Sequence, residues 1–325
     1  MLLRLVPQKT EINFLGFRKI AIALSALLIV ASMALFAINS LNYGIDFKGG
    51  IKLEIGTQGE PVDFDTVRSS LNGLNLGEIA VQGYGGPDKA LIRVERQPGG
   101  NEEQNAAMEQ VRQKLSEIIE GVEFRDQAVI GPKVSGELKQ DGTIAVSVAV
   151  LLVLVYIWFR FEWQFGLGAV IALVHDVLLT IGFFAITRLE FNLSIIAALL
   201  TIVGYSLNDT VVVYDRVREN IRKYRKKPME EVLNFSLNQT LSRTVMTSVT
   251  TLLALVALYV FGGPVIQGFT AAMIWGVVIG TYSSIFIASP VLLIFKLRPE
   301  ALLRDESDDN DPTVDKSRPT PFDQM

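Results

Sequence analysis

The sequence predicts a bundle of six membrane-spanning helices, with a small α+β ferredoxin-like domain inserted after the first helix. Long apolar segments predict the spans, because a helix that rises about 1.5 Å per residue needs about 20 residues to cross roughly 30 Å of hydrocarbon. A long polar stretch between the first and second apolar segments predicts the inserted domain. Half of the 325 residues are hydrophobic and none is cysteine, so we expect no disulfide and no thiolate metal site.

The first predicted span covers residues 20–38 and follows a short N-terminal segment, residues 1–19. Its apolar region is longer than that of a typical signal peptide and no Ala-x-Ala cleavage site follows, which favours an uncleaved anchor. The remaining spans are predicted at residues 142–159, 165–186, 192–214, 240–262 and 268–295.

Lysine and arginine residues collect in three places: before the first span, in a predicted loop at 215–239, and after the sixth span. Counting crossings places all three groups on one side, which the positive-inside rule assigns to the cytoplasm. The loop cluster is either a topology signal alone or also a contact for lipid or a partner, and both interpretations remain open. Residues 296–325 form an acidic tail, also cytoplasmic, and its Asp-, Ser- and Pro-rich part from residue 304 is expected to be disordered.

Residues 39–139 are therefore expected to form the domain outside the cytoplasm. Alternating polarity predicts its strands and a period of 3.6 residues predicts its helices. The resulting order βαββαβ is that of a ferredoxin-like fold, which by itself identifies no function. The predicted elements are the strands 51–55, 78–83, 90–95 and 122–130 and the helices 63–74 and 102–119.

Four ionisable residues fall within the predicted spans: His175, Asp176, Asp209 and Arg243. A charged residue inside a bilayer costs at least about 2.5 to 3.5 kcal/mol on insertion scales, so each is a functional candidate. Asp209 and Arg243 come from consecutive antiparallel spans and lie within roughly 10 Å of the same boundary, so they could meet.

If the guanidinium of Arg243 approaches and withdraws, the proton affinity of Asp209 must change, which would tie protonation to helix movement. The alternative is a static ion pair that fixes two helices. Polar side chains near the pair could support it, namely Tyr205 on the face of Asp209 and Thr247 in a threonine stripe beside Arg243.

Asp176 lies deeper than Asp209 and is either a second carboxyl on the same path or a structural residue. For His175 we favour a packing role, because adjacent helical positions point about 100° apart and need not touch. One histidine and scattered carboxylates match no metal-ligand spacing, so no metal site is expected.

The sixth span carries small residues at every fourth position, a pattern that lets helices approach closely. This stripe predicts packing, either within the bundle or against a partner subunit. Its members are Gly268, Ala272, Gly276, Gly280, Ser284 and Ala288.

Three segments resemble motifs of the SecD/SecF family of protein-export subunits. Residues 42–50 read Asn-Tyr-Gly-Ile-Asp-Phe-Lys-Gly-Gly and resemble the family's signature after the first span. Residues 204–216, which include Asn208 and Asp209, closely resemble the SecF motif of the fourth span, and residues 238–244 resemble the motif that opens the fifth. In the first segment, the residues that match the signature are Gly44, Asp46, Gly49 and Gly50.

The resemblance implies half of a resistance-nodulation-division bundle in the bacterial inner membrane, with a separate SecD chain supplying the other half. It implies that the SecYEG channel, YajC and unfolded preprotein are further partners beside the lipid bilayer, and that the proton motive force drives late steps of export served by SecA. Asp209 and Arg243 would take part in the proton-coupled motion. A transport component of this kind is not an enzyme and needs neither cofactor nor nucleic acid.

Two other functions remain as alternatives. An efflux or lipid-transport half-unit of the same superfamily would have a similar bundle, although such proteins usually carry both halves in one chain. An intramembrane aspartyl protease could use Asp176 and Asp209 as two carboxyls that share a proton. A cationic partner for Asp209 would argue against that chemistry, because it would hold the carboxyl ionised.

Overall fold

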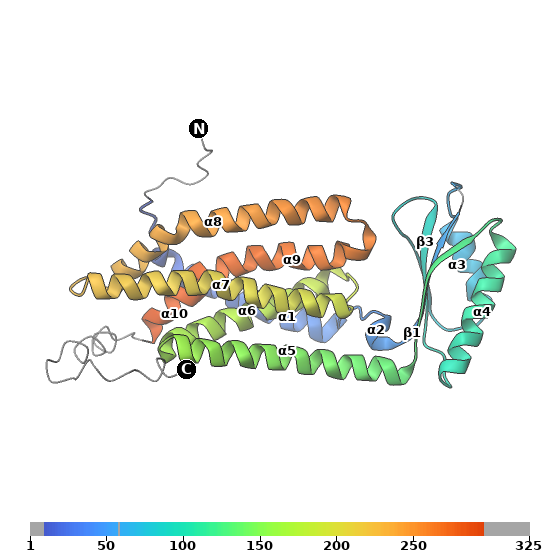
Figure 1. The fold of residues 1–325 in the computed structure, drawn as a ribbon, viewed down its shortest axis with the longest axis horizontal. Coiled ribbons are helices and arrows are strands. Elements are labelled where there is room, and N and C mark those ends of the chain that lie inside the picture. Colours follow the sequence, from blue (N-terminus) through green and yellow to red (C-terminus); the bar gives the residue numbers. More distant parts are fainter. Residues whose placement is uncertain (1–9, 58, 296–325) are drawn as a thin grey trace, which may run out of the picture.

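The computed structural model describes residues 10–57 and 59–295, and within them six helical segments are long and apolar enough to cross a membrane. These helices run beside one another, and a small α/β domain lies at one end of the bundle (Figure 1). The fold class predicted from the sequence is thereby confirmed. The expectations for residues 1–9 and for the acidic tail at 296–325 lie outside the described residues.

The bundle is built from helices that begin or end at turn-forming residues. Gly131 precedes α5, which has Pro132 at its start, and Gly263, with a φ of 77°, precedes α9. Proline fits the first turn of a helix because the amide it lacks would have no partner there. The helices are α1 (Arg18–Asn39), α5 (Pro132–Arg160), α6 (Trp163–Thr187), α7 (Leu193–Lys223), α8 (Met229–Phe261), α9 (Pro264–Ser283) and α10 (Ser289–Ile294).

The prediction of a loop at residues 215–239 is wrong, because most of these residues are helical. Helix α7 continues to Lys223 and α8 begins at Met229, so only residues 224–228 connect them. Arg222 and Lys223 lie in the last turn of α7, and Glu230 lies in the first turn of α8. These charges complement the helix dipoles, which favours helix beyond the apolar segments that were used to predict the spans.

Apart from the short helix α2, which was not predicted, the α/β domain has the predicted order of elements, and its four strands form an antiparallel sheet in the order β2-β3-β1-β4. Helices α3 and α4 cover the face of this sheet that points away from the bundle (Figure 1). The elements are α2 (Ile45–Lys48), β1 (Gly50–Gly56), α3 (Phe64–Asn72), β2 (Ile79–Gly83), β3 (Lys89–Val94), α4 (Asn101–Ile118) and β4 (Glu123–Ile130).

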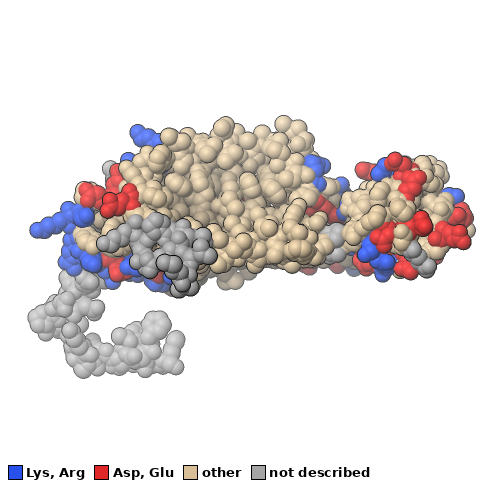
Figure 2. Space-filling model, turned by 90° about the horizontal axis from the view of Figure 1, so that it is seen from above, with Lys and Arg blue, Asp and Glu red and all other residues tan. Residues whose placement is uncertain are grey.

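Charged side chains are distributed at the ends of the molecule. On the face seen in Figure 2, a broad uncharged belt covers the bundle, and lysine, arginine and acidic residues gather at the end opposite the α/β domain. We call that end the basic end, because the lysines and arginines of residues 216–227 lie there. Trp158 and Trp163 are exposed where the belt meets it, as amphipathic aromatic residues are at membrane boundaries.

The last span is not a regular helix. A π-helical turn, Ser284–Ala288, lies between α9 and α10, and the hydroxyl of Ser289 donates to the carbonyl oxygen of Ser284 at 3.0 Å. Pro290 follows in the first turn of α10. A π-helical turn of this kind is often found at functional sites.

Candidate functional site: a polar network inside the helix bundle

Asp209 lies on α7 with 7% of its surface exposed, and both of its carboxyl oxygens are hydrogen-bonded. The hydroxyl of Thr244 on α8 donates to Oδ1 at 2.7 Å, and the hydroxyl of Ser284 donates to Oδ2 at 2.6 Å. Ser284 is the first residue of the π-helical turn. The carboxyl therefore joins three elements of the bundle.

Asp176 on α6 is fully buried and forms a second centre. Its Oδ2 accepts hydrogen bonds from Ser206 on α7 at 2.5 Å and from Ser283 on α9 at 2.8 Å. Its Oδ1 lies 2.8 Å from Nδ1 of His175. The contact between these adjacent residues, which the sequence left undecided, is present.

His175 is buried with both ring nitrogens in hydrogen bonds, because Nε2 lies 3.1 Å from the hydroxyl of Ser25 on α1. That hydroxyl lies 3.0 Å from the hydroxyl of Tyr282, whose ring stacks on the imidazole with centroids 5.9 Å apart. The packing role suggested for His175 fits this placement. The histidine also extends the network from Asp176 to the first span.

The two carboxyl centres are connected through neighbouring residues. Ser283 binds Asp176 and the next residue, Ser284, binds Asp209. A serine or threonine hydroxyl can donate or accept. The network can therefore stay hydrogen-bonded whether or not a carboxyl carries a proton.

The expected contact between Asp209 and Arg243 is absent in this structure. Arg243 is exposed and makes no ion pair with any residue that the structure describes. The residue beside it on α8, Thr244, takes the position next to the carboxyl. The sequence placed the two helices correctly, but it could not fix which side of α8 faces Asp209.

Arg243 belongs to an exposed polar face that α7 and α8 share at membrane depth. Thr201 and Asn208 are exposed on α7, and Thr247 and Thr250 lie one and two turns after Arg243 on α8. Neither Asn208 nor Thr247 binds Asp209, and the Thr247 hydroxyl donates to backbone carbonyls of its own helix.

Tyr205 is half-buried on α7, one turn before Asp209. Its hydroxyl lies 3.5 Å from that of Ser248 on α8, which lies 2.7 Å from the hydroxyl of Thr281 on α9. Tyr205 therefore adds a link between α7, α8 and α9 rather than a ligand to Asp209.

The small-residue stripe of the sixth span packs against α7 within the bundle. A Cβ added at Gly276 would overlap the side chain of Ile202, and one at Gly280 would lie 3.1 Å from Cβ of Ser206. A Cβ at Gly268 would lie 3.7 Å from Ile195, and Ala272 is fully buried. Of the two packing alternatives, the structure shows contact with α7. This approach brings α9 close enough for its serines to reach the carboxyls.

The signature loop after α1 joins the bundle to the sheet. Asp46 Oδ2 accepts the backbone N–H of Leu193 at 2.8 Å, which caps the first turn of α7. Gly44 donates its N–H to the carbonyl oxygen of Phe191 at 2.9 Å. Gly49 and Gly50 have φ of 75° and 129°, and a Cβ at Gly50 would lie 2.6 Å from the carbonyl oxygen of Val94 on β3. Glycine is needed there because other residues rarely adopt that backbone.

The serines that bind the carboxyls were not predicted from the sequence. Ser206 was not singled out, Ser283 was overlooked, and Ser284 was assigned to packing alone. The available signal was two consecutive serines in an apolar span, next to the small-residue stripe. The fold and this site define a multi-pass membrane protein with buried, hydroxyl-bound carboxyls and an inserted ferredoxin-like domain.

Comparison with known proteins identifies the family. Residues 110–298 match the family described as "Protein export membrane protein SecD/SecF, C-terminal". The chain is 45% identical over 296 residues to the protein translocase subunit SecF of Rickettsia bellii, covering 90% of this chain and 96% of that protein. It is also 45% identical over 302 residues to SecF of Rickettsia rickettsii, covering 90% and 94%. The chain therefore belongs to the SecF family of protein translocase subunits.

Solved structures agree with this assignment. The crystal structure of SecDF, a translocon-associated membrane protein from Thermus thermophilus, matches with a TM-score of 0.78 and 35% identity over 89% of this chain. SecDF in a super-membrane-facing form matches with a TM-score of 0.67 and 34% identity over 94% of this chain. This chain spans only 39% and 41% of those two SecDF chains.

Proposed function

We propose that this chain pairs with SecD and uses the proton motive force to promote late steps of preprotein export through the SecYEG channel with SecA. YajC is a further partner in the proposal. The basic end faces the cytoplasm, and the α/β domain lies outside it and handles unfolded preprotein. Membership of the SecF family supports a role in protein translocation, and the positive-inside rule supports the orientation.

The observation that carries the proton-coupled part is Asp209, a carboxyl buried at membrane depth whose described partners are hydroxyls alone. A cation that approaches such a group favours its ionised form, and withdrawal of the cation favours the neutral acid. Arg243 is the cation nearest along α8, one residue from the threonine that binds Asp209. A rotation of α8 that exchanges Thr244 for Arg243 would therefore release a proton from Asp209.

The exposed polar face of α7 and α8 supports SecD as the missing half. Arg243 and Asn208 are exposed within the apolar belt, where contact with lipid tails is costly. A second six-helix unit would cover this face and exclude lipid from it. The part of the SecDF chains that has no counterpart here supports the same conclusion.

The signature loop offers a mechanical link to the α/β domain. Asp46 caps α7, the helix that carries Asp209, and the same loop enters β1 at Gly50. Arg93 on β3 also forms an ion pair with Glu190, which lies in the connection before α7. Movement of α7 on protonation of Asp209 would therefore be transmitted to the sheet.

The test is export into inside-out membrane vesicles that contain SecYEG, SecD and this chain, measured with and without a proton gradient. Asp209→Asn keeps the shape of the side chain but cannot titrate. We expect normal insertion and normal SecD binding. The gradient-dependent part of the export rate should fall at least about tenfold, which corresponds to about 1.4 kcal/mol.

Asp141→Asn is the matched control, because Asp141 on α5 is exposed and has no hydrogen bond or ion pair with the described residues. It should export as the unchanged protein does. Full gradient-dependent export by Asp209→Asn at normal protein levels would contradict proton coupling at this residue.

Two alternatives fit the geometry less well. An aspartyl protease needs two carboxyls that share a proton, whereas Asp176 and Asp209 are bound to different serines and, among the described residues, not to each other. An efflux or lipid-transport half-unit would keep the bundle, but membership of the SecF family favours export.

A further inference from the structure

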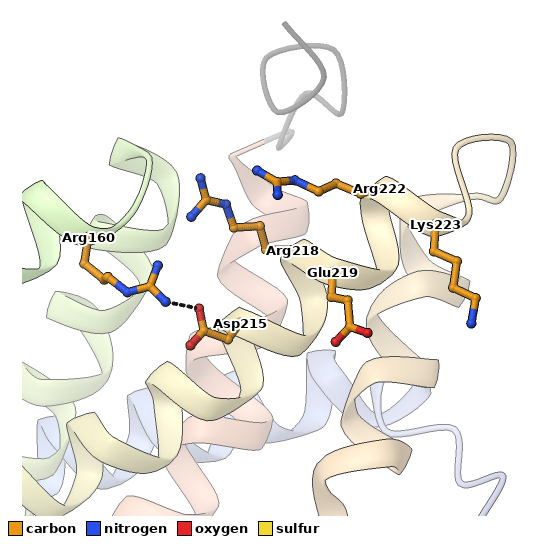
Figure 3. A pocket seen from close by; sticks show the side chains of 6 residues that line it. All are labelled: Arg160, Asp215, Arg218, Glu219, Arg222 and Lys223. Carbon is orange, nitrogen blue, oxygen red and sulfur yellow. Dashed lines mark hydrogen bonds and ion pairs between the residues drawn. The ribbon is translucent and has the colours of Figure 1, made fainter. Parts of the chain in front are cut away.

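A charged hollow of about 500 Å³ opens at the basic end, between the end of α5 and the last turns of α7. Figure 3 shows the side chains of Arg218 and Arg222 both extending toward the side on which Arg160 lies. The side chains of Glu219 and Lys223 point away from them in the same view. The lining residues are Arg160, Asp215, Arg218, Glu219, Arg222 and Lys223.

The carboxylates around this hollow are already engaged. Asp215 pairs with Arg160 at 2.8 Å, and Glu219 pairs with Arg216 at 2.8 Å. Oε1 of Glu162 lies 3.3 Å from Arg218, while its Oε2 is buried without a hydrogen-bond donor among the described residues. Arg222 has no ion pair with any described residue. Guanidinium groups that line one hollow with too few carboxylates between them favour an anion, and the planar fork of arginine suits phosphate oxygens.

Two nitrogens in the hollow lack hydrogen-bond partners. The Nε atoms of Arg218 and Arg222 are buried and have no acceptor among the described residues. A buried donor without an acceptor costs about 1 to 3 kcal/mol. An oxyanion between the two side chains would satisfy both donors, so these atoms point to a ligand independently of the charge.

A second hollow, also of about 500 Å³, lies between the end of α5 and the start of α6 and is almost wholly apolar. The turn between these helices carries Glu162, which pairs with Arg218 in the charged hollow. Apolar surface within the belt and cations at its edge are the two features that a phospholipid requires. The second hollow is lined by Leu154, Ile157, Trp158, Trp163, Gly166, Leu167 and Val170.

We propose that an anionic phospholipid of the leaflet at the basic end binds here. Its phosphate lies between Arg218 and Arg222, and one acyl chain occupies the apolar hollow between α5 and α6. The second hollow favours a lipid over free phosphate or a soluble acidic segment, because neither of those has a group to place in it. This proposal does not depend on proton coupling or on the partner of the exposed polar face.

The test measures lipid binding to the full chain in detergent by native mass spectrometry, with phosphatidylglycerol compared with phosphatidylcholine. We expect the unchanged chain to retain phosphatidylglycerol preferentially. Arg222→Gln should weaken that binding by about tenfold, because it removes a charge-assisted contact to phosphate. Arg222→Lys should restore only part of the affinity, since it keeps the charge and loses the fork.

Lys226→Gln is the matched control, because Lys226 is exposed in the turn after α7 and lies outside the lining of the hollow. It removes the same charge from the same end of the bundle. Equal losses for Arg222→Gln and Lys226→Gln would show unspecific attraction and overturn the proposal. Retained helix content and an unchanged unfolding transition in detergent confirm that each variant is folded.

The acyl chain is tested at Gly166, where an added Cβ would meet Ile157 at 3.5 Å, an ordinary contact. Gly166→Leu should therefore fold and fill the apolar hollow, lowering phosphatidylglycerol binding several-fold while leaving weak binding of inorganic phosphate unchanged. Removal of residues 296–325 tests whether the acidic tail, and not a lipid, occupies the charged hollow. If truncation creates lipid binding that the full chain lacks, the tail occupies the hollow and the lipid proposal fails.

Discussion

The α/β domain and the helix bundle bury different kinds of side chain. In the domain the buried residues are aliphatic with few exceptions, and the buried polar ones are Thr57 and Gln104 among those described. The bundle buries Asp176, His175 and Asp209 together with a series of serines and threonines. The bundle thus keeps at its centre the groups that a soluble core excludes.

This difference separates stability from function. An aliphatic core holds the sheet against α3 and α4 through burial alone, roughly 25 cal/mol per Å² of apolar surface. Burying a polar group lowers the stability of the fold unless its hydrogen bonds are made inside the protein. The network around Asp176 therefore stabilises the bundle only while its members remain hydrogen-bonded to one another. We therefore expect substitutions in the domain core to act locally, and substitutions in the network to affect the bundle and export together.

The largest effect is expected at Asp176. Asp176→Ala removes the acceptor of Ser206 and Ser283 and the partner of His175, all of which are buried. The free energy of unfolding of the bundle should fall by roughly 3 to 5 kcal/mol. Unfolding in mixed micelles measures this, with Asp176→Asn as the control that keeps the shape. Equal stability of the unchanged chain and Asp176→Ala would show that the network contributes nothing.

A smaller and more local effect is expected at Leu71, which is fully buried between α3 and the sheet. Leu71→Ala should lower the stability of the domain by about 2 to 4 kcal/mol, through lost burial and a residual cavity. Hydrogen exchange should become faster in α3 and in the strands and stay unchanged in α6 to α9. Faster exchange throughout the bundle would show that the two regions unfold as one unit.

The smallest effect is expected at Asp63, the N-cap of α3, whose carboxylate accepts the N–H groups of Asp65 and Thr66. The hydroxyl and N–H of Thr66 lower the pKa of the Asp63 carboxyl below its ordinary value of 3.8. A depressed folded-state pKa contributes stability above the unfolded value, which is lost as the pH falls through the folded value.

Asp63→Asn keeps the cap but does not titrate, since asparagine is as good an N-cap as aspartate. Between about pH 6 and about pH 3, the protection of the α3 amides, relative to the exchange rate of an unfolded chain at the same pH, should fall in the unchanged chain, and this fall should be missing in Asp63→Asn. The same pH dependence in both proteins would contradict a role for ionised Asp63.

Local patterns predicted the domain well and the network poorly. Strands such as β1 (Gly50–Gly56) alternate in polarity and α4 (Asn101–Ile118) has a clear helical period, so the four strands and the two longer helices were predicted to within a few residues, and only the four-residue α2 was missed. Hydropathy likewise located the spans. It could not show that α7 and α8 extend beyond the apolar belt, because helical structure there depends on charge and capping rather than on hydrophobicity.

Partners of the carboxyls depend on how the helices cross. Thr244 rather than Arg243 faces Asp209, and adjacent serines of α9 bind different carboxyls, because rotation of each helix is set by tertiary packing. The small-residue stripe that includes Gly276 predicted that another helix packs closely against the sixth span, but it did not predict that this helix is α7. Single-residue contacts of this kind follow from the fold and not from spacing in the sequence.

The central claim is that Asp209 changes its protonation as this chain works with SecD. Infrared difference spectra of the reconstituted pair, recorded as the pH is stepped, detect the carbonyl stretch of a buried protonated carboxyl. We expect a band that rises and falls with pH in the unchanged protein and is missing from Asp209→Asn, with Asp141→Asn like the unchanged protein. An identical band in Asp209→Asn, or no band in the unchanged protein at any pH where it exports, would contradict the account.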